Sequence, residues 1–112
     1  MPTIRTMAVY CGSNTGQGDA YLRAASHLGS ALAARDIRLV YGGTNKGLMG
    51  ALADAVLAGG GHVTGVITER LKAKGHDHQH LNTVETLPTM QARKKRMIEL
   101  ADGFIALPGG IG

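Results

Sequence analysis

Residues 37–68, IRLVYGGTNKGLMGALADAVLAGGGHVTGVIT, decide the fold of this chain. The segment begins with an apolar, β-rich run that ends at Gly42 and Gly43, and a second such run follows at residues 62–68. Residues 48–58 between them are apolar nearly all round, which predicts a well-buried helix. The glycines at positions 59–61 end that helix. Strand, helix and strand in this order predict a βαβ unit of a parallel sheet.

The same alternation extends in both directions. We predict further strands over residues 4–10, 83–86 and 103–107, and helices over residues 19–35 and from 88 to about 101, with Thr89 as the N-cap of the second. Residues 69–82 are polar and irregular. One α/β domain over residues 1–112 is therefore expected, with a Rossmann-like parallel sheet flanked by helices on both faces. Because residues 104–107 are apolar enough for a strand buried on both faces, and no helix follows them, we expect the domain to be truncated or covered by a partner.

Composition excludes several classes of protein. Cys11 is the only cysteine, so a disulfide framework and a zinc ribbon are excluded and a cytoplasmic location is favoured. We expect this thiol to be a small buried hydrophobe rather than a reactive group. No run reaches the roughly 18 apolar residues of a membrane span, and the N-terminus lacks the apolar core of a signal peptide. The net charge of +4 permits an anionic partner, but the basic residues are dispersed and no aromatic platform accompanies them, so nucleic acid is not expected.

Glycine-rich turns follow three of the predicted strands. Parallel sheets bind ligands beyond the carboxyl ends of their strands, where glycine lets the backbone approach a phosphate. Tight packing between strand and helix would also require glycine, but three such turns together favour a nucleotide or sugar phosphate. The candidate binding residues are Gly12 and Ser13, Gly42 and Gly43, and Gly109 and Gly110.

Two familiar phosphate-binding motifs are absent. Gly42 and Gly47 have the spacing of a Walker A loop, but Leu48 and Met49 follow where lysine and serine or threonine are required. Gly12 is not followed by a glycine two positions later, as a dinucleotide fingerprint requires.

Helical spacing separates the basic residues near the end of the chain. It predicts an apolar arc that also contains Arg93 and Lys94, and it places Lys95, Arg96 and Glu99 on the solvated side. A guanidinium on a buried side needs an anion. The spacing leaves open whether that anion is a protein carboxylate or a bound phosphate. The apolar members of the arc are Met90, Met97, Ile98, Leu100 and Ala101.

Five motifs occur in a recognisable order: Tyr41-Gly42-Gly43, Gly47-Leu48-Met49-Gly50, Gly65-Val66-Ile67, Met90-x-x-Arg93-Lys94 and Pro108-Gly109-Gly110-x-Gly112. This set resembles the LOG (Lonely Guy) family of cytokinin riboside 5'-monophosphate phosphoribohydrolases, which have often been labelled lysine decarboxylases. The resemblance implies a Rossmann-like homodimer. It also implies hydrolysis of a purine nucleoside 5'-monophosphate, either AMP or an N6-substituted AMP, to the free base and ribose 5-phosphate.

The resemblance assigns roles to individual residues. Arg93 matches the catalytic arginine and Lys94 its neighbour in the substrate site. Residues Gly109, Gly110, Ile111 and Gly112 match the start of the phosphate-binding turn. The family motif continues with a threonine and a catalytic glutamate, and the sequence stops before both. The chain departs from the family at Gly75, where a substrate-contacting glutamate is common, and at Gln91 and Ala92, where histidine and glutamate are common. These departures weaken the implied preference for a cytokinin over adenine.

Cleavage of an N-glycosidic bond builds positive charge on the ribose and requires a nearby carboxylate. Asp77, Glu85 and Asp102 are the candidates here, and none has the family position. We therefore expect the chain alone not to be a competent hydrolase. The alternative is a non-catalytic carrier of a nucleotide or molybdenum cofactor with the same fold, which Arg93 and Lys94 disfavour and the missing glutamate favours.

Two remaining features indicate no cofactor and no metal. Pyridoxal phosphate needs a Schiff-base lysine and a partner for its pyridinium nitrogen, and no lysine of this chain has that setting. His76, His78 and His80 alternate in a way that could hold a metal. Because the segment is polar and short histidine tracts have low specificity, we favour a flexible surface loop.

Overall fold

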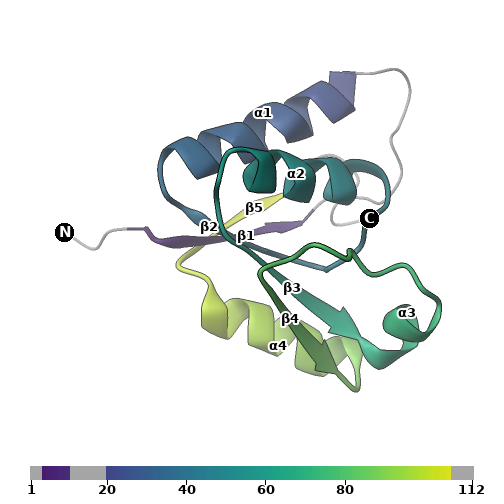
Figure 1. Cartoon of the computed structure of the whole chain (residues 1–112). Helices are drawn as coiled ribbons and strands as arrows, with labels where there is room; N and C mark the ends of the chain where they lie inside the picture. Colours follow the sequence, from purple (N-terminus) through teal and green to yellow (C-terminus); the bar gives the residue numbers. More distant parts are fainter. Residues whose placement is uncertain (1–3, 11–19, 107–112) are drawn as a thin grey trace.

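The computed structural model describes residues 4–10 and 20–106. Five strands alternate with four helices within these ranges (Figure 1). The strands are β1 (Thr6–Tyr10), β2 (Arg38–Tyr41), β3 (Val63–Thr68), β4 (Thr83–Leu87) and β5 (Gly103–Ala106). The helices are α1 (Ala20–Ala34), α2 (Gly47–Ala58), α3 (Glu69–Ala73) and α4 (Met90–Leu100).

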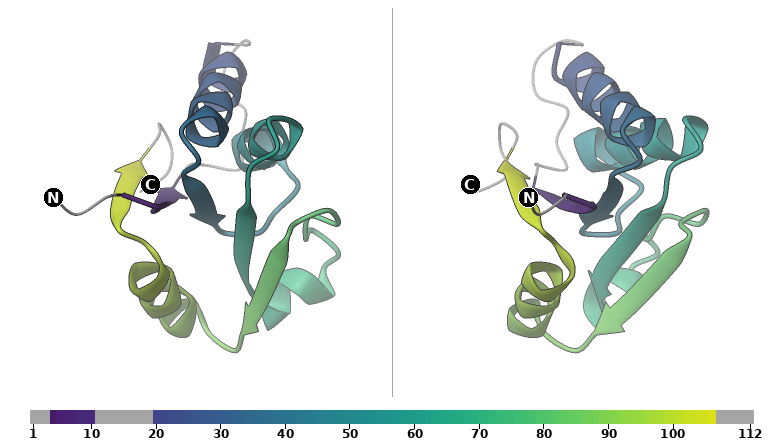
Figure 2. Two further views of the ribbon diagram at one scale, coloured as in Figure 1. Left: turned by 60° about the vertical axis from the view of Figure 1, so that its left-hand side comes forward. Right: turned by 90° about the vertical axis from the view of Figure 1, so that its left-hand side faces the viewer.

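The strands form one parallel sheet in the order β4-β3-β2-β1-β5. The chain steps outward from β1 to β4 and then returns across the sheet to place β5 beside β1. Because crossovers between parallel strands are right-handed, this reversal puts α1 and α2 on one face and α4 on the other, as the views in Figure 2 show. The order reverses between β1 and β5, so their carboxyl ends flank the switch point.

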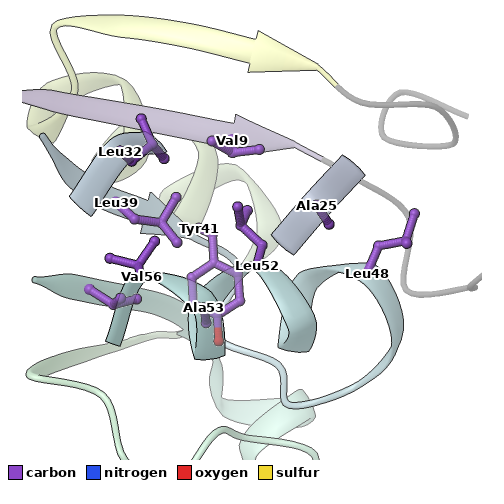
Figure 3. Close-up of a cluster of buried hydrophobic side chains, with 10 residues drawn as sticks. Val9, Ala25, Leu32, Leu39, Tyr41, Leu48, Leu52, Ala53 and Val56 are labelled. Atoms are coloured by element: carbon purple, nitrogen blue, oxygen red, sulfur yellow. The ribbon is translucent and has the colours of Figure 1, made fainter. Parts of the chain in front are cut away.

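The larger part of the core lies between the sheet and the α1–α2 layer. Leu39 and Tyr41 of β2 are fully buried there against Leu52 and Val56 of α2 (Figure 3). The Tyr41 hydroxyl donates to the carbonyl of Thr44 at 2.7 Å, so the buried phenol is satisfied. A smaller cluster on the opposite face packs Met97 of α4 against Ala8, Val40 and Val66.

The predicted parallel sheet with helices on both faces is confirmed. All five predicted strands and the three long helices are present, with ends that differ by a residue or two. Thr89 caps α4 as predicted, because its side chain accepts from the Ala92 N–H at 3.1 Å. The short helix α3 was missed within the segment expected to be irregular. Its N-cap is Thr68, whose hydroxyl accepts from the Leu71 N–H at 3.2 Å.

The described part of the chain does not cover the last strand on both faces, so the cover expected from a further segment or a partner is not supplied within it. In the described part of the chain β5 pairs only with β1, and the Phe104 side chain is 52% exposed. The physical reason is the course of α4, which packs across β1 to β4 and leaves this side of β5 open. Within residues 4–10 and 20–106, no helix is both long and apolar enough to cross a membrane.

Candidate functional site

The first turn of α4 brings Arg93 to the carboxyl edge of the sheet. The helix returns antiparallel to the strands, so its N-terminal turn lies where β2 and β3 end. The Arg93 Nε–H donates to the carbonyl of Val66 in β3 at 2.7 Å. The Arg93 Nη1 donates to the sulfur of Met90, with 3.7 Å between the nitrogen and the sulfur. Arg93 is half-buried, which confirms its predicted place on the inward side of the helix.

Gly42 lies directly beneath this guanidinium. A Cβ at position 42 would overlap Nη2 of Arg93 and come within 3.1 Å of Cζ. The φ angle of Gly42 is not among the positive values, so space rather than backbone conformation requires glycine here. The following residue, Gly43, has φ +83°, which itself favours glycine. The glycine turn after β2 and Arg93 therefore lie at the same edge of the sheet, a contact that the sequence did not predict.

The guanidinium has no acidic partner among the described residues. Burial lowers the pKa of Arg93 from its usual value, and the nearby Tyr10 phenol partly opposes that effect. Arginine stays protonated in proteins, so the charge is kept at a cost in solvation that no carboxylate of the described chain offsets. Of the two partners left open by the sequence, the structural ion pair is therefore absent from the described residues. An anionic ligand would relieve the cost.

The carboxylates considered from the sequence have other positions. Asp102 accepts from the backbone N–H groups of Arg5 and Thr6 at 2.9 and 3.0 Å, at the amino edge of the sheet. Glu85 of β4 is held by Arg96. Of these three, only Asp77 lies beside the glycine turn, since its backbone forms a bridge with Thr44.

Three predictions for α4 were wrong. Lys94, predicted to lie within the buried arc, is exposed. Met90 and Ile98 were also placed in that arc, and they are 49% and 59% exposed. Arg96 lies on the solvated side as predicted, with its side chain 39% exposed, and it donates to Glu85 at 2.6 Å from Nε and 3.2 Å from Nη2. The arc is narrower than helical spacing indicated, because α4 contacts the sheet mainly through Arg93, Met97 and Leu100.

The histidine tract is not a free surface loop. His78 is buried, its Nε2 lies 2.7 Å from Asp54 Oδ1 of α2, and its ring meets that of His80 edge-on with centroids 6.0 Å apart. No group of three metal-ligating side chains occurs in the described ranges.

Other site predictions lie outside the described residues: Cys11, Gly12, Ser13, Gly109, Gly110, Ile111 and Gly112. Sequence reasoning missed Tyr10 and the contact of Met90 with Arg93. Tyr10 could have been found from the sequence, because it ends a predicted strand at the edge of the sheet where a ligand was expected.

Comparison with known families is specific. A family model described as "Possible lysine decarboxylase" matches residues 49–112. A cytokinin riboside 5'-monophosphate phosphoribohydrolase of Rhodococcoides fascians is 46% identical over 112 residues, covering 99% of this chain and 57% of the relative. A protein of the same name from Arabidopsis thaliana is 44% identical over 108 residues, covering 96% and 50%. The chain thus spans about half the length of the curated relatives it matches.

Solved structures agree on the fold. The molybdenum cofactor carrier protein of Chlamydomonas reinhardtii superposes with a TM-score of 0.75 at 18% identity, covering 98% of this chain and 65% of that one. At this identity the likeness shows a shared architecture alone.

Proposed function

Because the chain belongs to the LOG family, we propose that it hydrolyses the N-glycosidic bond of a purine nucleoside 5'-monophosphate, either AMP or an N6-substituted AMP. The bond between the base nitrogen and C1′ of the ribose breaks. Water supplies a hydroxyl to C1′ and a proton to the base, which leaves ribose 5-phosphate and free base. The curated relatives are named for this reaction on cytokinin riboside 5'-monophosphates.

One observation carries the proposal: Arg93 is a half-buried cation at the ligand edge with no carboxylate beside it in the described chain. Its Nε–H is used by Val66, while the Nη2 hydrogens have no acceptor among the described contacts. These hydrogens are suited to an anion, since a guanidinium binds phosphate and carboxylate through paired N–H donors. We assign Arg93 as the catalytic residue, which contacts the nucleotide or orients the carboxylate that stabilises the ribosyl cation.

Of the remaining candidate binding residues, Gly42 lies next to Arg93. We propose that the backbone of Gly42 and Gly43 contacts the substrate beside the guanidinium. Lys94 is exposed and would contact the substrate from the solvent side of the site. We propose that the phosphate is held by Gly12 and Ser13 together with residues 109–112, as one nucleotide-binding domain over residues 1–112. The carboxylate needed at C1′ is not supplied by Glu85 or Asp102, which are engaged elsewhere.

A decarboxylase is a poorer interpretation of the same chain. Pyridoxal phosphate would require a lysine in a sheltered pocket with a partner for the pyridinium nitrogen. The lysines of this chain are all exposed, at positions 46, 72, 74, 94 and 95. The carrier alternative has no specific support either, because the likeness to the molybdenum cofactor carrier shows architecture alone.

We further propose a homodimer formed through α4 and β5. Arg96 reaches Glu85 on β4, so the opposite flank of α4, which carries Ile98, faces the β5 edge. Phe104 is 52% exposed at that edge and Ile98 59%. Two such faces would cover one another around a twofold axis. The single cysteine suits a cytoplasmic location.

The direct test is incubation of the protein, expressed from its complete gene, with AMP and N6-substituted AMP. Chromatography is expected to show free base and ribose 5-phosphate in equal amounts. If no purine monophosphate releases base, the enzyme function is rejected. Binding of the same nucleotides without cleavage would instead support the carrier.

A further inference from the structure

The imidazole of His78 is buried and uses both of its nitrogens. His78 is 6% exposed. Nδ1 accepts from the backbone N–H of His80 at 3.0 Å, so the ring proton is on Nε2 and is donated to Asp54 Oδ1 at 2.7 Å. Through these two hydrogen bonds the ring ties the segment after α3 to helix α2.

The backbone around His78 runs along the glycine turn that follows β2. The His78 N–H donates to the carbonyl of Gly43 at 2.8 Å. The Thr44 hydroxyl donates to the carbonyl of His76 at 3.1 Å, and Thr44 and Asp77 form an antiparallel bridge. Residues 76–78 thus run alongside the turn and are joined to it by backbone hydrogen bonds and one isolated antiparallel bridge.

The other sides of the same turn are also enclosed. A Cβ on Gly65 of β3 would come within 3.0 Å of the Gly43 Cα, so the turn already leans on β3. Arg93 lies over Gly42. Residues 76–78 form the remaining side of the turn, and the His78 imidazole anchors them to α2. The position of Gly42 relative to Arg93 therefore depends on these residues.

We propose that His78 is a positioning residue for the nucleotide site. Its side chain is anchored to Asp54, and its backbone N–H holds the Gly43 carbonyl, so that it fixes the turn that carries Gly42. The effect on kcat that we expect from this role rests on the proposed function. His78 itself touches no substrate. Asp54, whose side chain is 69% exposed, supplies the acceptor for this anchor from the solvent side of α2.

Three substitutions separate the two hydrogen bonds of the ring. His78→Ala removes both. His78→Gln places an amide N–H near the position of Nε2 and can still donate to Asp54, whereas His78→Asn places an amide oxygen near Nδ1 and can still accept from the His80 N–H. We expect His78→Ala to lose roughly 10²-fold in kcat, with KM little changed, because small misplacements at a reacting centre have effects of that size. His78→Gln should recover most of the loss and His78→Asn little of it, since the link to α2 is the anchor.

The matched control is His27→Gln, at an exposed histidine of α1, which should leave kcat and KM unchanged. NMR of the Gly42 amide and the Arg93 Nε–H provides a readout independent of catalysis. Both signals should shift in His78→Ala and return in His78→Gln. Melting temperatures identify variants that fail to fold.

Wild-type kcat in folded His78→Ala would overturn the proposal, as would a loss that follows melting temperature alone and is not rescued by glutamine. If the wild-type protein releases no base, the proposed function fails separately. The positioning role is then judged from the NMR signals, and unshifted Gly42 and Arg93 signals in His78→Ala reject it.

Discussion

The guanidinium of Arg93 occupies the space that a side chain at position 42 would need. A Cβ on Gly42 would overlap Nη2 and approach Cζ to 3.1 Å. The arginine cannot move away freely, because its Nε–H is bound to the Val66 carbonyl at 2.7 Å. Each residue therefore defines what the other position can hold, although they are far apart in the sequence.

Gly42→Ala is expected to displace the guanidinium while the protein still folds, because the φ angle of Gly42 is not in the left-handed region that favours glycine. We expect a loss in kcat/KM of roughly 10²-fold and a small change in melting temperature. The double variant Gly42→Ala, Arg93→Ala should lose no more activity than Arg93→Ala alone, since both act on one contact.

Gly103→Ala is the matched control for Gly42→Ala. Its Cβ would meet the flexible end of Met7 at 3.3 Å, far from Arg93, so activity should be unchanged. Equal losses from the two glycine substitutions would contradict the steric relationship with Arg93.

Substitutions of Arg93 should affect activity more than stability. No carboxylate of the described chain would be left unpaired, so Arg93→Ala should melt close to the wild-type temperature. Arg93→Lys keeps the charge but loses the planar fork, and we expect it to fold and to lose most turnover. Thermal melts and base-release rates measure the two effects. A collapse of the melt in Arg93→Lys would mean that the residue is structural.

Arg96→Ala is the control on the same helix. It breaks the pair with Glu85 at the sheet edge, so a small drop in melting temperature is expected with turnover unchanged. Loss of turnover equal to that of Arg93→Ala would show that the two arginines are not distinguished by their positions.

Asp102 should make stability depend on acid pH. Its pKa is lowered by hydrogen bonds from the backbone N–H of Arg5 and then of Thr6. A carboxyl whose pKa is lower in the folded than in the unfolded state stabilises the fold above the unfolded value, about 3.9. That contribution is lost as pH falls through the folded value. Urea unfolding from about pH 7 to about pH 3 should show this decline, and Asp102→Asn should flatten it. An identical pH dependence in Asp102→Asn would count against this assignment.

Ile98→Arg should dissociate the proposed homodimer. The charge would enter the exposed apolar face of α4 and β5, and desolvating it in an interface is unfavourable. Sedimentation velocity at micromolar concentration should show wild-type dimer and variant monomer. Tyr21→Arg, at an exposed position on α1 on the other face of the sheet, should remain dimeric. A monomeric wild-type protein would contradict the proposal.

The sequence was sufficient for the parts of this protein that depend on local periodicity. Alternating strand and helix patterns predicted the parallel sheet and most element ends, because β2 and β3 are apolar for most of their length and α2 ends at Gly59. The 3.6-residue repeat placed Arg93 on the side of α4 that carries Met97. The glycine turns indicated the edge of the sheet at which a ligand would bind.

Tertiary structure alone decided what each of those side chains meets. Periodicity gives the direction of a side chain from its own helix axis, whereas its partner depends on which strands lie beneath. The order β4-β3-β2-β1-β5 puts Val66 and Gly42 under Arg93, and Glu85 beside Arg96. The breadth of the sheet covered by α4 decided that Ile98 and Phe104 are exposed. His78 and Asp54 meet because the segment after α3 pairs with the turn that follows β2, a long-range contact that no local pattern specifies.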